Sequence, residues 1–143
     1  MIRLAGLGDL DAIMALETAA FPAGWSRAAW ADELAHHVVT VTGEPVRAVL
    51  SVSQVADTME VRRIIVDESV RCTGIGRGLL EAALADAAPG TTVFLEVSAE
   101  NQPAIRLYEG CGFEPLSRRA GYYGPGDDAI VYHWTKEATC PNR

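Results

Sequence analysis

The alternation of strand and helix patterns in the middle of this chain is the feature that most constrains its fold. An apolar strand pattern leads through a glycine-rich turn into an amphipathic helix, and a second strand and a second helix follow at once; the four segments span 59–66, 74–88, 91–97 and 102–111. Strands joined by a helical crossover pair in parallel, because a tight hairpin cannot connect them. The sequence therefore predicts a sheet that contains a parallel pair.

The flanking segments predict shorter elements. Apolar residues recur with a helical period after Asp9, and Ser26 is placed to cap a second short helix. Alternating or valine-rich runs indicate strands at 1–4, 37–42, 46–55, 113–120 and 128–134, with the last two on either side of a loop, GYYGPGDD. The order of elements predicts a mixed α/β sheet. At 143 residues, the chain fits one domain over 1–135 followed by a flexible C-terminal tail, 136–143.

Charge and cysteine usage argue against several classes of protein. The net charge is −7 at pH 7 and the basic residues are scattered, whereas nucleic-acid binding favours a concentrated basic face. No run approaches the ~18 apolar residues of a membrane helix, and acidic residues stand where a signal peptide has its apolar core, so we expect a cytoplasmic protein. The three cysteines match neither a disulfide framework nor a metal motif. We expect free thiols and no metal site.

The glycine-rich turn, VRCTGIGRGLL, has the composition of an anion-binding loop, because glycine lets backbone N–H groups approach a phosphate closely. It lacks the lysine of a triphosphate-binding P-loop, and Leu79 stands where a dinucleotide fingerprint has its third glycine. What remains is Arg71 followed by Gly74 and Gly76 at a helix N-terminus, where the N–H groups and the helix dipole favour a pyrophosphate. On this segment alone, a glycine-rich helix start without a ligand stays open as the alternative.

Two motifs, in their order along the chain, resemble the GNAT acyltransferases, which bind acetyl-CoA. RCTGIG (71–76) resembles that family's R/Q-x-x-G-x-G/A turn, and NQPAIRLYEGCGF (101–113) resembles its NxxAxxLYxxxGF segment. Within the superfamily, FPAGWS, FLEV and RRAGYYGPGDDAIV are similar to the RimI-like ribosomal-protein-alanine N-acetyltransferases. The resemblance covers nearly the whole chain. It implies a GNAT fold, with a mixed, mostly antiparallel sheet of about seven strands that includes a parallel splayed pair, flanked by about four helices.

The resemblance also implies the ligands and where they bind. Acetyl-CoA would be the cosubstrate, and the acceptor would be the N-terminal amine of a protein, typically the alanine of a ribosomal protein. Acetyl-CoA would lie along a strand end, the glycine-rich turn and a later helix cap, at Ile64, Ile65, Val66, Arg71, Cys72, Thr73, Gly74, Ile75, Gly76, Arg77 and Asn101. The acceptor would lie beside Trp25, Ser26, Tyr122, Tyr123 and Asp128.

Acetyl transfer to an amine needs a base for the ammonium proton and an acid for the departing thiolate. Glu96 is a carboxylate in an otherwise apolar strand, where it is costly unless it is paired or open to a cleft. By period two it shares a face with Phe94 and Ser98. The resemblance implies that Glu96 is the general base and Tyr108 the general acid, whereas the residues alone also allow a surface glutamate and a core tyrosine.

Other functions stay open at this stage. An acetyl-cysteine intermediate on Cys72 or Cys111 needs a neighbouring base, and the histidines lie far from both in the sequence. A GNAT enzyme that acetylates a small amine or an antibiotic is a second alternative. The third is a non-catalytic acetyl-CoA-binding module, against which the presence of both Glu96 and Tyr108 argues.

Two departures from the RimI-like pattern bear on the acceptor. That pattern usually has an arginine where this chain has Ser98. Its final strand usually ends with an apolar residue such as methionine, where this chain has Tyr132, His133 and Trp134. Both departures leave the expectation of acetyl-CoA unchanged and bear on which amine is acetylated.

Overall fold

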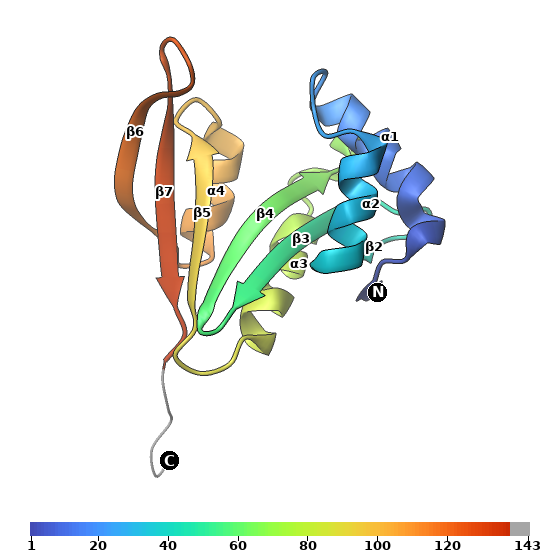
Figure 1. Ribbon diagram of the computed structural model, residues 1–143, viewed down its shortest axis with the longest axis horizontal. Coiled ribbons are helices and arrows are strands. Elements are labelled where there is room, and N and C mark those ends of the chain that lie inside the picture. The colour runs from blue at the N-terminus through green and yellow to red at the C-terminus, as the bar shows by residue number, and fades with distance from the viewer. Residues whose placement is uncertain (138–143) are drawn as a thin grey trace. The chain divides into compact units, whose positions relative to one another are not determined.

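The computed structural model describes residues 1–137, whose strands follow the sheet order β1-β2-β3-β4-β5-β7-β6 (Figure 1). Over this range the strands are β1 (Ile2–Leu4), β2 (Val38–Thr42), β3 (Ala48–Val55), β4 (Thr58–Val66), β5 (Thr92–Ser98), β6 (Glu114–Gly124) and β7 (Asp127–Thr135). The helices are α1 (Leu10–Ala20), α2 (Arg27–His36), α3 (Ile75–Asp86) and α4 (Gln102–Gly110), with short 3-10 turns η1 (Leu7–Asp9) and η2 (Glu68–Val70). The predicted mixed sheet and its four helices are confirmed.

The parallel pair predicted from the strand–helix pattern is β4 with β5. Thr58 pairs with Thr92 and Glu60 with Phe94, in parallel register. The neighbouring pairs β1–β2, β2–β3, β5–β7 and β6–β7 are antiparallel. The chain divides into two compact units, which are described separately below: a first unit of Met1–Ser53 with Val61–Ala83, and a second of Gln54–Glu60 with the chain from Leu84 onward.

In the first unit, the apolar face of α1 is packed into the core. Leu10, Ile13 and Leu16 recur at helical spacing, and all three are buried. They pack in one cluster with Trp30 of α2 and with strand and loop residues Val39, Val41, Val46, Val49 and Ile65. Ser26 caps α2 as predicted, because its Oγ accepts a hydrogen bond from the Ala29 N–H at 3.0 Å.

In the second unit, β5 alternates as a half-buried strand should. Val93, Leu95 and Val97 are buried, while the intervening side chains, Phe94, Glu96 and Ser98, are partly exposed. The helix that follows begins at a cap that the sequence also predicts, since Asn101 Oδ1 accepts the Ala104 N–H at 3.2 Å. The period-two reading of this strand is confirmed.

The predicted loop GYYGPGDD is shorter in the structure. Tyr122 and Tyr123 belong to β6, which continues to Gly124 with an irregular register after Arg119. Gly121 has a φ of +64°, a left-handed conformation that glycine adopts without strain, and its N–H donates to Asp128 Oδ1 at 2.8 Å. A bulge held in this way lets the strand continue where turn-forming residues predict its end.

The expected tail starts at residue 136, and its residues 138–143 lie outside the described part of the chain. Lys136 exchanges backbone hydrogen bonds with Thr91 and Gly90, and its Nζ donates to Leu84 O at 3.2 Å and to Ala85 O at 2.7 Å. Across residues 1–137, no helix combines the length and apolar character that a membrane crossing requires.

Candidate active site

Glu96 opens on a cavity of the second unit. The cavity has a volume of about 320 Å³ and is lined by Glu60, Phe94, Leu95, Glu96, Arg119 and Val131. The strand register explains this grouping, because Glu60 pairs with Phe94 and Glu96 pairs with Val131 on neighbouring strands. The carboxylate is 26% exposed, so it is open to a ligand in the cavity.

Arg119 of β6 is the partner of this carboxylate. Its Nη1 lies 3.1 Å from Glu96 Oε2, and its guanidinium carbon lies 5.2 Å from the ring centroid of Tyr122. The cavity lining therefore carries two carboxylates and one guanidinium, a balance that favours a cationic ligand. The sequence does not single out Arg119, because the pairing depends on the register between β6 and β7.

Tyr123 links the predicted base to the predicted acid. Burial raises the pKa of Tyr123, and the nearby charge of Glu96 raises it further. The nearby Tyr123 phenol also contributes to the raised pKa of Tyr108. Its ring packs edge-on against Tyr122, with the ring centroids 5.1 Å apart. Glu96, Tyr108 and Tyr122, which the resemblance places in the site, are therefore all neighbours of Tyr123.

Tyr108 occupies α4 and is 6% exposed. Its ring lies 6.0 Å, centroid to centroid, from the ring of Phe113. Burial is the main cause that raises the pKa of the Tyr108 phenol above its usual value. Electrostatic repulsion from Tyr123 and Cys111 raises this pKa further. The hydroxyl is therefore protonated at neutral pH and retains a proton that it can donate.

The glycine-rich turn lies in the first unit, directly before α3. The first N–H bonded within the helix is that of Gly78, which donates to Gly74 O at 2.9 Å. The preceding N–H groups of a helix start have no partner within the helix and are oriented for an anion. Gly74 has a φ of +88°, and a Cβ placed there would have no atom within 4 Å, so a ligand can approach this backbone closely. Cys72 has a φ of +64° and is exposed.

The side chains of this turn hold its shape. Thr73 Oγ1 donates to Val70 O at 2.5 Å, and Arg71 Nε donates to Val66 O at 3.2 Å. Arg77 pairs with Glu81 one helical turn away, and both side chains are half-exposed. Ile65 is buried in the core, so it would meet a cofactor through its backbone. The geometry of residues 71–77 fits a pyrophosphate.

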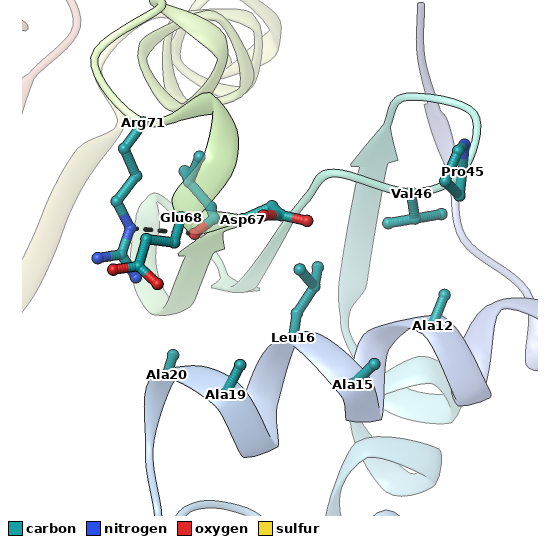
Figure 2. A pocket seen from close by; sticks show the side chains of 11 residues that line it. Ala12, Ala15, Leu16, Ala19, Ala20, Pro45, Val46, Asp67, Glu68 and Arg71 are labelled. Carbon is teal, nitrogen blue, oxygen red and sulfur yellow. Dashed lines mark hydrogen bonds between the residues drawn. The ribbon is translucent and has the colours of Figure 1, made fainter.

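A second cavity lies beside this turn, within the first unit (Figure 2). Its volume is about 380 Å³, and an alanine-rich face of α1 lines it opposite Asp67, Glu68 and Arg71. Arg71 therefore lines this cavity and also belongs to the glycine-rich turn that is predicted to bind acetyl-CoA. The sequence does not reveal this cavity, because α1 and η2 are far apart along the chain.

The predicted acceptor residues are divided between the two units. Trp25 and Ser26 precede α2 in the first unit, whereas Tyr122, Tyr123 and Asp128 belong to the second. Asp128 accepts hydrogen bonds from Arg118 Nε and the Gly121 N–H, both at 2.8 Å. The two tyrosines are 50% and 47% exposed, so both are available to a ligand.

The two departures from the RimI-like pattern have structural roles. Ser98 Oγ donates to Asp127 Oδ1 at 2.5 Å and ties the end of β5 to the start of β7. Tyr132 is buried, and its hydroxyl donates to Glu109 Oε2 of α4 at 2.9 Å. The Trp134 ring packs 6.4 Å, centroid to centroid, from that of Phe113. The aromatic end of β7 therefore attaches this strand to α4 and the chain after it.

Metal-binding geometry is not found in the described chain: residues 1–137 hold no group of three or more His, Cys, Asp or Glu side chains placed to bind an ion. Cys72 and Cys111 are thiols and not disulfide partners. Cys140 lies outside the described residues.

Comparison with known proteins identifies the family to which the chain is similar. The profile described as "Acetyltransferase (GNAT) family" matches residues 10–113. The chain is 34% identical over 140 residues to the uncharacterized protein ML0378 of Mycobacterium leprae, with 91% of this chain and only 38% of that protein covered. It is 36% identical over 107 residues to the N-alpha-acetyltransferase RimI of Mycobacterium tuberculosis, covering 69% of this chain and 67% of the relative.

Among solved structures, the fold is similar to the ribosomal-protein-S18-alanine N-acetyltransferase from Escherichia coli. The TM-score is 0.86 at 27% sequence identity, and the alignment covers 100% of this chain and 97% of the other. The resemblance drawn from RCTGIG and NQPAIRLYEGCGF is thereby confirmed.

Proposed function

We propose that this chain, which belongs to the acetyltransferase (GNAT) family, transfers an acetyl group from acetyl-CoA to the N-terminal amine of a protein. The observation that carries the proposal is the partly exposed carboxylate of Glu96, set in a buried strand and opening on a cavity lined by two carboxylates and one guanidinium. The most informative relatives support the substrate class, because their names describe N-alpha-acetyltransferases.

The glycine-rich turn would hold the pyrophosphate of acetyl-CoA. The N–H groups in the first turn of α3 would supply hydrogen bonds, and the exposed side chains of Arg71 and Arg77 would supply positive charge. The pantetheine arm would lie along the backbone of Ile64, Ile65 and Val66, with Asn101 near its end. When bound, acetyl-CoA supplies an activated thioester carbonyl.

Glu96 would act as the general base. Its carboxylate takes one proton from the acceptor ammonium, and the neutral nitrogen then attacks the thioester carbonyl carbon. Before that step the ammonium competes with Arg119 for the same carboxylate, because the guanidinium occupies Oε2 in the structure. Arg119 would then turn toward the ring of Tyr122, where a cation is also stabilised.

Tyr108 would act as the general acid. As the carbon–sulfur bond breaks, the electron pair goes to sulfur and the Tyr108 hydroxyl donates its proton there. The nitrogen, now bonded to the acetyl carbon, releases its second proton to solvent, which leaves a free thiol and a neutral amide. The raised pKa of Tyr108 means that the phenol is protonated at neutral pH before the thiolate forms. Solvent then returns a proton to the Tyr108 phenolate and takes the proton from Glu96, which completes the cycle.

The acceptor would be the N-terminus of a ribosomal protein, bound beside Trp25, Ser26, Tyr122, Tyr123 and Asp128. Aromatic side chains suit a peptide backbone, since they offer flat apolar surface with a polar edge. An N-terminal alanine agrees with the name of the similar E. coli protein, a ribosomal-protein-S18-alanine N-acetyltransferase. Such an acceptor places the reaction in the cytoplasm.

Mass spectrometry tests the proposal directly. The purified protein is incubated with acetyl-CoA and a peptide that begins with alanine and copies a ribosomal-protein N-terminus. We expect one acetyl group on the α-amine and none on the same peptide with a blocked N-terminus. Transfer to polyamines or aminoglycosides in preference to the peptide would overturn the acceptor, and acetyl-CoA binding without transfer to any amine would overturn the activity.

A further inference from the structure

The carboxylate of Glu17 in α1 organises the segment that carries Trp25. Glu17 is 1% exposed, and it accepts hydrogen bonds from the Trp25 N–H at 3.0 Å, from Trp30 Nε1 at 2.8 Å and from Arg63 Nε at 3.2 Å. Arg63 Nη2 donates to the second carboxylate oxygen. One buried side chain therefore joins α1, the loop before α2, the body of α2 and β4.

Arg63 fixes the same segment from the other side. Its guanidinium carbon lies 3.9 Å from the ring centroid of Phe21 and 4.6 Å from that of Trp25. The Trp25 ring in turn lies 5.1 Å from the Trp30 ring. Trp25 is thus held at its backbone by Glu17 and at its ring by Arg63, while part of the side chain stays exposed.

The backbone at Gly24 passes so close to this carboxylate that only glycine fits there. A Cβ at Gly24 would lie 2.0 Å from Glu17 Oε2 and 2.8 Å from Phe21 Cβ. Burial raises the pKa of Glu17, but the hydrogen bonds from Arg63, Trp30 and Trp25 outweigh it, and the pKa lies below its usual value. Glu17 is therefore charged at neutral pH and remains paired.

We propose that Glu17 and Arg63 are a positioning pair for acceptor binding, which they control through Trp25. The inference rests on the proposed function, in which Trp25 contacts the acceptor. Neither side chain of the pair needs to touch the peptide. Their role is to hold the indole in the one orientation that the acceptor meets.

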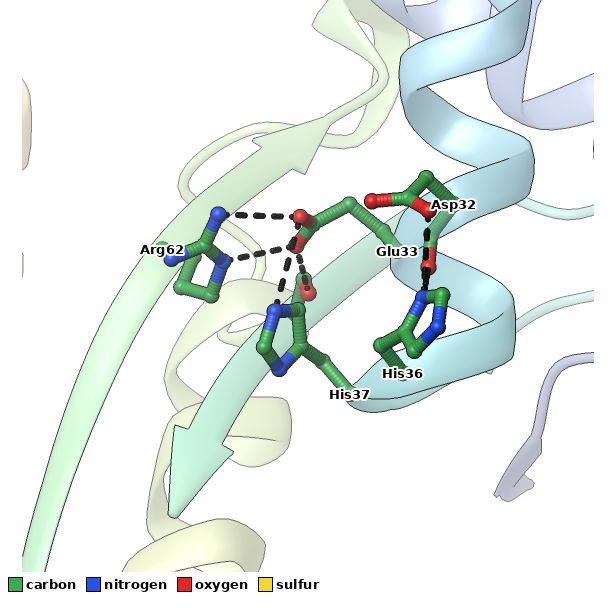
Figure 3. Close-up of polar contacts among 6 residues, drawn as sticks. Asp32, Glu33, His36, His37 and Arg62 are labelled. Atoms are coloured by element: carbon green, nitrogen blue, oxygen red, sulfur yellow. Dashed lines mark hydrogen bonds and ion pairs between the residues drawn. The ribbon is translucent and has the colours of Figure 1, made fainter. Parts of the chain in front are cut away.

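The chain offers a matched control in a second buried pair, Glu33 with Arg62 (Figure 3). Glu33 of α2 accepts from Arg62 Nε at 2.8 Å, from Arg62 Nη2 at 3.0 Å and from Ser51 Oγ at 2.8 Å. His37 Nε2 lies 3.9 Å from the same carboxylate. Like Glu17, Glu33 joins a helix to β4 and is almost completely buried, but the partners named above do not include Trp25.

The test compares Glu17→Gln with Glu33→Gln in steady-state acetyl transfer. We expect Glu17→Gln to raise the KM for the peptide about 10- to 100-fold, with kcat and the KM for acetyl-CoA nearly unchanged. Glu33→Gln should leave all three constants near those of the parent protein. Equal changes in both variants would mean a general loss of stability and would overturn the proposal.

Tryptophan fluorescence gives a readout that does not depend on activity. Acrylamide should quench Trp25 more strongly in Glu17→Gln than in Glu33→Gln, because only the first variant releases the Trp25 backbone. If the parent protein acetylates no peptide, the proposed function fails, while the quenching still tests whether Glu17 holds Trp25. Unchanged quenching in Glu17→Gln would overturn the positioning role even where transfer is observed.

A second matched pair of variants keeps the inference testable if Glu17→Gln does not fold. Arg63→Lys keeps the positive charge but loses the planar group that stacks on Trp25, and Arg62→Lys makes the same change at the control pair. A rise in the peptide KM for Arg63→Lys alone supports the proposal. The same KM in both variants contradicts it.

Discussion

Arg119 and Glu96 form an ion pair at the mouth of the cavity, with 3.1 Å between Nη1 and Oε2. The arginine side chain is 55% exposed and the carboxylate 26%. Exposed pairs of this kind contribute about 0–1 kcal/mol to stability, so the protein loses little when the pair separates. The guanidinium is therefore an easily displaced occupant of the position that the acceptor ammonium would take.

Replacing Arg119 should tighten acceptor binding. In Arg119→Met the ammonium no longer competes with a guanidinium, and the cavity becomes more negative, so we expect a lower KM for the peptide in steady-state kinetics. Arg3→Met is the matched control, because Arg3 also forms an ion pair, with Asp9 at 2.7 Å, and neither residue is among the proposed acceptor contacts. A peptide KM that rises in Arg119→Met would show that Arg119 binds the acceptor.

Removing the proposed base should slow the chemical step. We expect Glu96→Gln to lower kcat by about 100- to 10,000-fold, the usual contribution of a general base, with little change in the dissociation constant for acetyl-CoA. Stopped assays of peptide acetylation and calorimetry of acetyl-CoA binding measure the two quantities. Unchanged turnover would exclude Glu96 as the base.

Removing the Tyr108 hydroxyl should also slow the reaction. Tyr108→Phe preserves the ring that packs on Phe113, so the fold is retained and we expect kcat to fall by about 100-fold or more. The loss should shrink with an acyl donor whose thiol is more acidic, because such a thiolate leaves without a proton. Tyr132→Phe controls for the loss of a phenol hydroxyl from another buried tyrosine of the second unit, although it also breaks the bond to Glu109. Equal turnover in Tyr108→Phe and the parent protein contradicts the assignment.

Substitution by alanine should disturb the glycine-rich turn at Gly74 but be tolerated at Gly78. Gly74→Ala places a side chain at a φ of +88°, which costs roughly 1–2 kcal/mol, so we expect the turn to shift and the KM for acetyl-CoA to rise. Gly78 lies inside α3 with open space around its Cβ position, and alanine there should stabilise the helix by about 0.5–1 kcal/mol. Thermal unfolding and acetyl-CoA titration separate the two effects.

The buried Glu17 should make stability depend on acid pH. Because its pKa in the folded protein lies below the ordinary 4.5, its stabilising contribution is complete above that value and is lost as the pH falls through the lowered pKa. Glu17→Gln should therefore cost about 3 kcal/mol at neutral pH, and progressively less as the pH falls below 4.5. Urea unfolding of both proteins across this range measures the difference. Glu81→Gln, at a half-exposed pair, should show little change at any pH.

Local signals in the sequence predict much of this structure. The alternation of Val93, Leu95 and Val97 determines which face of β5 carries Glu96. Asn101 caps α4 by accepting the N–H of Ala104, three residues away. Both features depend on residues within a few positions of each other. The predicted roles of Glu96 and Tyr108 rest on the family resemblance and stay predictions.

Contacts between distant segments are not predictable from the sequence in the same way. Glu17 and Arg63 are 46 residues apart, and nothing in either local pattern selects one as the partner of the other. The pairing of Arg119 with Glu96 depends on how β6 is aligned with β7, where the register shifts between Arg119 and Gly124. A one-residue change in that alignment would send the arginine side chain to the opposite face of the sheet.

Lys136 determines where the chain can be shortened. Its ammonium donates to Leu84 O and Ala85 O in the last turn of α3, where a cation offsets the exposed carbonyls and the negative end of the helix dipole. Its backbone also extends the pairing with Thr91 beyond the end of β7. An affinity tag or a crystallisation truncation should therefore be placed after Lys136, because a cut before it would expose the end of the helix that begins at the glycine-rich turn.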